Sequence, residues 1–147
     1  CHGLLAKPSL YLSDYFERNK GAYYDALTRV RVSNDLGHWI KMFLVAVIAT
    51  AEKGKETFGQ ILELRNKVEG EIIGMGRRAK NAQRLLALLY RQPTTNADHV
   101  QKSLKLSKRS AHQLVQSMVR AGVLVELTGF KRNRLFCFQQ YLELFLK

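Results

Sequence analysis

The chain has 147 residues with a formal net charge of +12, and 46% of its residues are hydrophobic. That apolar fraction can supply a buried core, which excludes a wholly disordered chain. The longest strongly apolar run, Met42 to Ala51, has ten residues and is about half of what a membrane-spanning helix requires. The first twelve residues also lack the basic start and apolar run of a secretory signal. The sequence therefore predicts a protein without membrane contact that is cytoplasmic.

The positive charge is concentrated in the second half of the chain. Residues 1–75 carry ten Lys and Arg against nine Asp and Glu, whereas residues 76–147 carry fourteen against three, so the net charges are +1 and +11. Clustered cations without carboxylates repel one another and favour association with an anion. We therefore expect a polyanionic partner, such as nucleic acid, to contact the second half.

Apolar spacing predicts three helices in the first half of the chain. A first helix is expected from Ser13 through residue 32, because apolar residues recur at helical intervals. A second is expected after Asn34 or Asp35 as N-cap, and Gly54 is expected to end it in a left-handed turn. Its centre is apolar on all sides, so we expect it to be the most buried element.

A third, more polar helix is expected over residues 56–73. Its inward positions are Ile61, Leu64, Val68 and Ile72. Glycines at positions 70, 74 and 76 are expected either to break this helix or to loosen its end. We therefore predict two domains, residues 1–76 and residues 77–147.

The second domain is predicted to begin with three helices. The first covers residues 79–92 and stops at Pro93. The second starts at a capping-box-like pair, Thr95 and Asp98, and the third is capped by Ser107 and ended by Gly122. The last two helices are separated by a short turn, which is typical of a helix-turn-helix.

Two short apolar segments, residues 122–127 and 133–138, then predict a two-stranded β-hairpin with Gly129 at its turn. A short helix is expected from Gln139. The predicted fold is mainly α, a helical subdomain followed by a winged helix-turn-helix with a small two-stranded β-hairpin.

The second helix of a helix-turn-helix enters the major groove of DNA, and its first turns contact base edges. In this geometry Arg109 is suited to guanine and Gln113 to adenine. Lysines and arginines of the preceding helix and of the hairpin loop are expected to neutralise phosphates. The predicted DNA-binding residues are Lys102, Lys105, Lys108, Arg109, Ser110, His112, Gln113, Gln116, Lys131, Arg132 and Arg134.

Two other interpretations of the basic second half stay open. The charged residues can be the solvated face of an amphipathic helix. Alternatively, the domain is a protein-interaction or dimerisation module that does not bind DNA.

The sequence gives little indication of an active site. No glycine-rich phosphate loop occurs, and the four histidines have no metal-ligand spacing. The two cysteines, Cys1 and Cys137, lie at opposite ends of the chain, so we expect neither a disulfide framework nor a zinc site. Cys137 is expected to be a buried thiol in a strand. We expect no cofactor in this chain.

The chain resembles a known family. The segment HGLLAKPSLYLSDYFERNKGAYYDAL is similar to the one that follows the catalytic helix in Fic-domain proteins, which are protein adenylyltransferases. NDLGHWIKMFL resembles the next Fic helix, and TGFKRNRLFCFQQYLELF resembles the end of the winged helix often appended to these proteins. The resemblance covers essentially the whole chain.

The family's catalytic motif, HxFx(D/E)GNGR, is absent from the chain, because His2 is followed by Gly3 and Leu4. The resemblance therefore implies a noncatalytic C-terminal portion of a Fic protein, with ATP and Mg²⁺ used only by the full-length parent. It implies that the first half packs on the rest of the Fic domain. A piece lacking that partner is expected to expose apolar surface and to self-associate.

Overall fold

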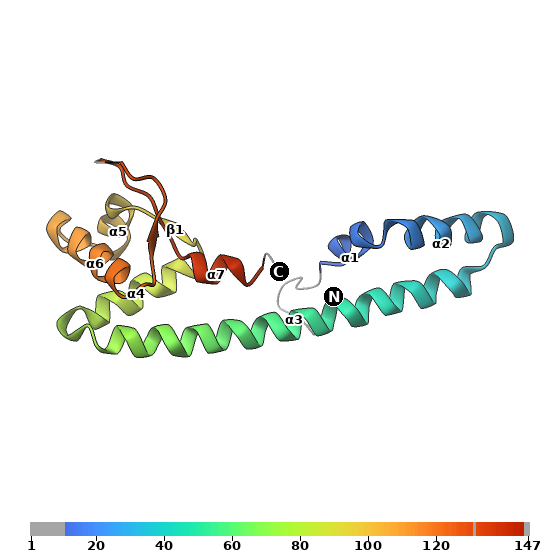
Figure 1. Cartoon of the computed structure of the whole chain (residues 1–147), viewed down its shortest axis with the longest axis horizontal. Helices are drawn as coiled ribbons and strands as arrows, with labels where there is room; N and C mark the ends of the chain where they lie inside the picture. The colour runs from blue at the N-terminus through green and yellow to red at the C-terminus, as the bar shows by residue number, and fades with distance from the viewer. Residues whose placement is uncertain (1–10, 131, 146–147) are drawn as a thin grey trace. The chain divides into compact units, whose positions relative to one another are not determined.

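The computed structural model describes residues 11–130 and 132–145. Over these residues the protein is mainly helical, with a small antiparallel sheet (Figure 1). The elements are α1 (Leu12–Arg18), α2 (Lys20–Ser33), α3 (Leu36–Ile73), a 3-10 turn η1 (Gly76–Arg78), α4 (Ala79–Leu89), β1 (Thr94–Thr95), α5 (Ala97–Leu104), α6 (Lys108–Arg120), β2 (Val125–Glu126), β3 (Phe136–Cys137) and α7 (Gln139–Glu143). The chain divides into two compact units, unit 1 (residues 1–58) and unit 2 (residues 59–147). The predicted domain boundary at residue 76 stays a prediction.

The first predicted helix of unit 1 is two helices. α1 ends at Arg18 and α2 begins at Lys20, with Asn19 between them in a non-helical conformation. The Asn19 side chain donates a hydrogen bond to the Tyr15 carbonyl at 2.9 Å. Asparagine interrupts helices in this way because its side chain competes with backbone hydrogen bonding. α2 then ends at Asn34, which adopts the left-handed conformation.

The expectation that the first half of α3 is the most buried element is wrong. The start of the helix is as predicted, because the Asp35 carboxylate accepts the His38 backbone N–H at 3.0 Å. Aromatic rings join α3 to α1, with Phe43 centred 6.3 Å from Phe16. Within the described residues of unit 1, however, only Ala26 and Ala46 are buried, because α1 and α2 cover α3 on one side only (Figure 1).

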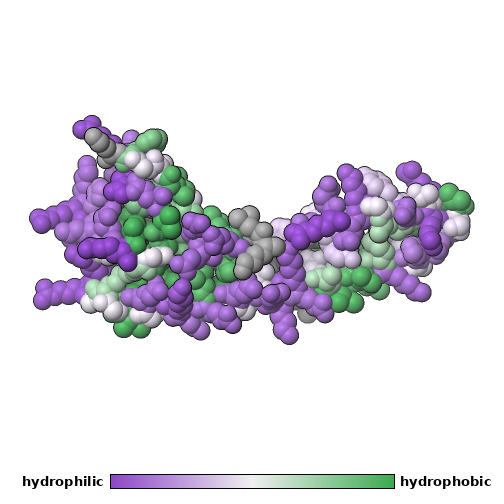
Figure 2. All heavy atoms as spheres, viewed as in Figure 1, coloured by the Kyte–Doolittle hydropathy of each residue, from purple (hydrophilic) through white to green (hydrophobic). Residues whose placement is uncertain are grey.

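The uncovered side of α3 in unit 1 is hydrophobic. Four large apolar side chains on it are 45–59% exposed, namely Ile40, Leu44, Val45 and Ile48. Figure 2 shows hydrophobic residues gathered over this part of α3. We call this surface the α3 stripe.

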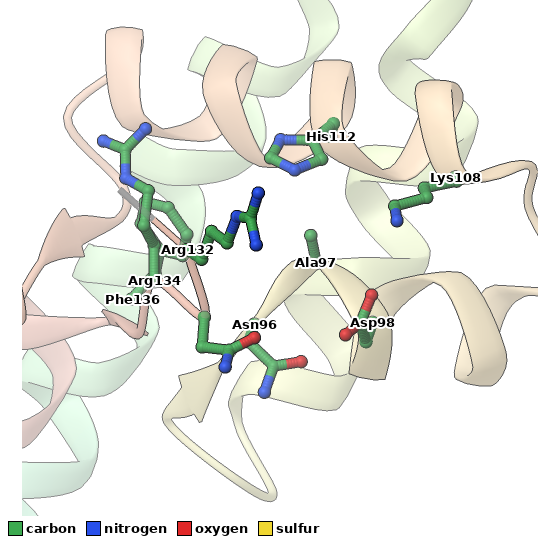
Figure 3. A pocket seen from close by; sticks show the side chains of 9 residues that line it. Asn96, Ala97, Asp98, Lys108, His112, Arg132, Arg134 and Phe136 are labelled. Atoms are coloured by element: carbon green, nitrogen blue, oxygen red, sulfur yellow. The ribbon is translucent and has the colours of Figure 1, made fainter. Parts of the chain in front are cut away.

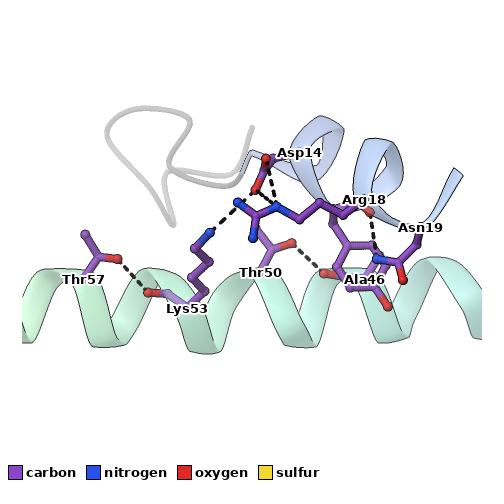
Figure 4. A network of polar contacts seen from close by, with 8 residues as sticks. Asp14, Arg18, Asn19, Ala46, Thr50, Lys53 and Thr57 are labelled. Atoms are coloured by element: carbon purple, nitrogen blue, oxygen red, sulfur yellow. Dashed lines mark hydrogen bonds and ion pairs between the residues drawn. The ribbon is translucent and has the colours of Figure 1, made fainter. Parts of the chain in front are cut away.

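Polar contacts join α1 to α3 in unit 1 (Figure 4). The Asp14 carboxylate lies 3.3 Å from Arg18 on its own helix and 3.7 Å from Lys53 on α3. All three side chains are about half exposed, so each pair contributes little, about 0–1 kcal/mol. These ion pairs therefore add little to the stability of unit 1.

The predicted end of a helix at Gly54 is also wrong, since α3 continues through it to Ile73. Gly54 does not adopt a positive φ, and the Thr57 hydroxyl donates to the Lys53 carbonyl at 3.0 Å across it. A helical glycine costs about 1 kcal/mol relative to alanine, which favourable neighbours readily offset. The helix ends after Ile73, and Gly76 provides the left-handed turn with φ of 58°.

Unit 2 has one continuous hydrophobic core. Three of the four inward residues predicted for the third helix, Leu64, Val68 and Ile72, are buried in it as expected. The fourth, Ile61, is only partly buried. The core residues are Leu64, Val68, Ile72, Ala82, Leu85, Leu86, Leu89, Val100, Leu104, Ala111, Leu114, Val115, Met118, Val123, Leu124, Phe136 and Phe138. The helices and the sheet of unit 2 therefore pack against the same hydrophobic core.

The sheet of unit 2 has three strands in the order β1-β3-β2, not the two that the sequence predicted. The predicted hairpin is present, with Val125 opposite Cys137 and Glu126 opposite Phe136. The additional strand, β1, pairs antiparallel with the other edge of β3. Thr95 therefore belongs to a strand and is not the cap of α5, and that cap is Asn96.

Two further predictions concern the thiol of Cys137 and membrane-spanning helices. Cys137 is a buried free thiol in β3, as expected, and burial raises the pKa of this thiol. Among the described helices, none combines the length and the hydrophobicity that crossing a bilayer requires.

Candidate nucleic-acid interface

Short-range hydrogen bonds determine where α5 begins and ends and where α6 begins. The Asn96 side chain accepts the His99 backbone N–H at 2.7 Å and starts α5, and the Ser107 hydroxyl accepts the Ser110 N–H at 3.1 Å and starts α6. Between the helices Lys105 has a left-handed φ of 53°, and the Leu106 N–H returns to the Gln101 carbonyl at 3.0 Å. This hydrogen bond is typical of a helix-ending Schellman turn. The turn sets the angle between the two helices.

α6 has one buried face and one polar face. Its buried residues are Ala111, Leu114, Val115 and Met118. The opposite face exposes Lys108, Arg109, Ser110, His112 and Gln113, with Gln116 partly buried. The structure thus brings all the predicted residues of α6 to one side of one helix, where no acidic side chain of that helix interferes, since α6 contains none.

A cavity of about 510 Å³ lies between the start of α5, α6 and the loop of residues 127–135. We call it the loop cavity. Its lining residues are Asn96, Ala97, Asp98, Lys108, His112, Arg132, Asn133, Arg134 and Phe136. Figure 3 shows Lys108 and His112 on α6 across the cavity from Asn96 and Asp98, with Arg132 entering from the loop. Cations from two separate elements therefore meet around one opening.

Backbone geometry holds the loop of residues 127–135 in place beside α6. The Leu127 N–H donates to the Leu135 carbonyl at 2.9 Å, and the Leu135 N–H donates to the Thr128 hydroxyl at 3.1 Å. Gly129, with φ of 61°, and Asn133, with φ of 54°, provide the left-handed positions of the bend. Gly129 lies at the turn, as the sequence predicted.

The three cations predicted in this loop have different environments. Arg132 is exposed and lines the loop cavity. Arg134 forms a two-point ion pair with Glu126 and lies over the Phe136 ring at 5.4 Å. The hydrogen bond from Arg134 holds the pKa of Glu126 below its ordinary value, and the same bond raises the pKa of Arg134. The Arg134 charge is thus already paired with a carboxylate. The third predicted cation, Lys131, lies outside the described residues.

Lys102 and Lys105, the two predicted cations of α5 and its turn, are exposed. Neither lines the loop cavity. They extend the positive surface of unit 2 without joining the cluster around Lys108 and Arg132.

Arg78 was missed by the sequence analysis. Its guanidinium donates to the Ser117 hydroxyl at 3.2 Å and to the Gln113 side-chain oxygen at 3.5 Å, both on α6. The sequence signal was the basic segment GRRAK, which was interpreted only as a domain boundary. Gln113, predicted to read adenine, is therefore already in contact with an arginine.

The described residues contain no group of three or more His, Cys, Asp or Glu side chains placed to hold a metal ion. What the arrangement offers chemically is a set of hydrogen-bond donors and positive charges, which suits an anionic ligand. A scan against protein-family models and a search of the curated proteins both find no match for this chain.

Proposed function

We propose that unit 2 is a winged helix-turn-helix that binds duplex DNA, with α6 as the recognition helix and the 127–135 loop as the wing. The order helix, strand, helix, helix, strand, loop, strand and the sheet order β1-β3-β2 support this assignment. α5 and α6 are joined by the short turn that a helix-turn-helix requires. This topology supports the proposed fold. The proposed DNA binding is supported by the exposed face of α6 and the loop beside it.

The observation that carries the binding proposal is the convergence of Lys108 and His112 on α6 with Arg132 on the loop around one open cavity. These side chains lie in a half of the chain with fourteen Lys and Arg and only three Asp and Glu. Duplex DNA presents a dense row of phosphates beside a groove wide enough for an α-helix. Its backbone is therefore a suitable ligand for a cation cluster next to an exposed helix.

In the proposed complex the exposed face of α6 lies in the major groove. Arg109 projects from the centre of that face and is suited to a two-point contact with guanine. The phosphates are contacted by Lys102, Lys105, Lys108, Lys131 and Arg132. Arg134 contributes mainly by holding the loop through Glu126, since its charge is already paired.

A paired-charge substitution tests this proposal. K108A/R109A removes two charges from the face of α6, and R29A/R31A removes two exposed charges from α2 in unit 1 as a matched control. We expect K108A/R109A to weaken duplex binding at least tenfold, about 1.4 kcal/mol, in fluorescence anisotropy, because each lost contact costs about 1–3 kcal/mol. The control should bind like the unmodified protein. Equal effects of the two double substitutions would refute the proposed site.

Self-association is a second candidate function, favoured by the α3 stripe. Exposed contiguous apolar surface on a soluble protein is typical of an interaction site. If the α3 stripe pairs two copies, L44E/I48E should convert the protein to a monomer in analytical ultracentrifugation, while substitution of the exposed polar Lys41 by Glu should not. A monomeric unmodified protein would exclude this function.

The resemblance to Fic-domain proteins supports a further proposal, that the chain is a noncatalytic C-terminal portion of a Fic-type adenylyltransferase. The support is the LYLS, YFERN and YY motifs and the Trp39 helix. Determining the coding sequence upstream of Cys1 tests it. The motif HxFx(D/E)GNGR close upstream would support the proposal, and an upstream sequence without it would contradict an enzymatic parent.

A further inference from the structure

The guanidinium of Arg78 is held on the surface of α6 by side chains of that helix. Ser117 and Gln113 accept its hydrogen bonds at 3.2 and 3.5 Å, and the Ser117 hydroxyl in turn donates to the Gln113 carbonyl at 2.9 Å. Arg78 is exposed, and none of the ion pairs between described residues includes it. It is therefore a positioned cation with no carboxylate partner in the part of the chain that the structure describes.

A small cavity of about 110 Å³ lies beside this arginine. Its lining residues are Arg78, Asn81, Leu106, Ser110, Gln113 and Leu114. Three kinds of hydrogen-bond donor line this cavity near the start of α6: the Ser110 hydroxyl, the Asn81 amide and the Arg78 guanidinium. We call it the Arg78 cavity. It is distinct from the loop cavity, since the two have no lining residue in common.

The two cavities lie along opposite margins of the exposed face of α6. An α-helix turns by about 100° per residue, so Lys108 and His112 share one margin while Gln113 and Ser117 share the other. Arg109 and Gln116 fall between them by the same geometry. The recognition helix is thus bordered by Lys108, His112 and Arg132 on one side and by Arg78 on the other.

Further positive charges lie close to Arg78 in the sequence. Arg77, Lys80 and Arg84 are exposed on η1 and α4, and the sequence has no Asp or Glu between residue 72 and residue 97. Lys80 and Arg84 are one helical turn apart, where like charges disfavour a helix slightly. A negatively charged ligand at this end of α4 removes that repulsion.

We propose that Arg78, positioned by Gln113 and Ser117, binds a phosphate of the DNA strand across the major groove from the strand contacted by the loop. The inference rests on the proposed DNA-binding function. A helix in the major groove has a phosphate backbone on each side of it, so cations on both margins of α6 match both strands. Gln113 then serves as a positioning residue for Arg78 and does not read adenine.

The salt dependence of binding to a short mixed-sequence duplex tests this site. Each phosphate contact contributes about −0.9 to the slope of log affinity against log salt. We expect R78A to make the slope less steep by about one and R132A to do the same independently, so that R78A/R132A changes it by about two. The matched control is R91A, which removes an exposed arginine of unit 2 two residues after the end of α4.

Two further variants separate phosphate binding from a structural role. R78K keeps the charge, so its slope should stay near that of the unmodified protein. R78Q removes the charge but retains a donor for Ser117, so it should reproduce the reduced slope, and it replaces R78A in the test if R78A fails to fold by circular dichroism. Q113A should weaken binding without changing base preference.

The possible outcomes distinguish the two proposals. If the unmodified protein binds duplex with a steep slope and R78A and R78Q leave that slope unchanged, the Arg78 site is wrong and the proposed function stands. If R78K and R78Q reduce the slope equally, the arginine acts through structure and the site is again wrong. If the unmodified protein does not bind duplex at all, the proposed function and this inference both fail.

Discussion

Units 1 and 2 bury their apolar residues very differently. Unit 2 has one core of large aliphatic and aromatic side chains, which includes Phe136 and Phe138. In the described part of unit 1 only Ala26 and Ala46 are buried, while the α3 stripe faces outward. Both halves of the sequence contain amphipathic helices, so helical periodicity by itself does not indicate which half is stable. What distinguishes unit 2 is that its helices and strands cover one another.

The largest expected difference between the units is in the free energy of unfolding lost when one aromatic side chain of each is truncated. Phe138 is fully buried and lies 5.8 Å from the Tyr90 ring, so F138A should lower the free energy of unfolding by about 3–5 kcal/mol. Phe43 is only partly buried, and F43A should cost less than about 2 kcal/mol. Urea denaturation followed by circular dichroism measures both. Equal losses would show that unit 1 contributes as much core as unit 2.

A smaller effect is expected from the cap of α6. S107A removes the hydroxyl that accepts the Ser110 N–H, and the loss of such a cap costs about 1 kcal/mol. S103A removes an exposed hydroxyl inside α5 and is the matched control. Thermal denaturation should show a lower midpoint for S107A only. A midpoint unchanged by S107A would mean that tertiary packing alone fixes the start of α6.

The smallest effect concerns the ion pair between Glu126 and Arg134. Because Arg134 lowers the pKa of Glu126 in the folded protein, the pair adds stability above the ordinary glutamate pKa of about 4.3. That stability is lost as the pH falls through the lowered value. E126Q should therefore be less stable than the unmodified protein at neutral pH and equal to it in strong acid, as measured by thermal midpoints from pH 7 downward.

The matched control for this pair is E63Q, which changes an exposed carboxylate on α3. It should follow the unmodified protein at every pH. A difference between E126Q and the unmodified protein that does not shrink in acid would mean that the pair is not its cause.

The predictable parts of the fold were those determined by neighbours in the sequence. Ser107 and Gly122 bound α6 as expected, and Gly129 lies at the bend of the loop, because caps and left-handed turns depend on a few adjacent residues. Val100 and Leu104 of α5 are both buried and lie one helical turn apart, which is the spacing of a helix with one buried face.

The incorrect predictions involved residues whose conformation depends on distant contacts, or whose own preference competes with that of the neighbouring helical residues. Thr94 and Thr95 form a strand only because β3 pairs with them, and two residues carry no periodic signal of their own. Gly54 has a weak helix propensity that the rest of α3 overrides, and Asn19 interrupts a pattern that is otherwise helical.

The sequence predicted the exposed residues of α6 in the candidate site. It did not predict the contacts of the arginines on either side of α6. The polar face of α6 follows from its periodicity, whereas the contact of Arg78 with Ser117 joins residues 39 positions apart. Likewise, the sequence shows Arg132 and Arg134 as equivalent cations, and only the fold shows that Arg134 is paired with Glu126.

The salt dependence of duplex binding by the unmodified protein tests the central claim most directly. If unit 2 neutralises about five phosphates, or six with Arg78, the logarithm of the affinity should fall with the logarithm of the salt concentration at a slope of about −4 to −5.5. A slope in that range, obtained by fluorescence anisotropy, supports a winged helix that binds the DNA backbone. A flat line, or no binding at low salt, would contradict it.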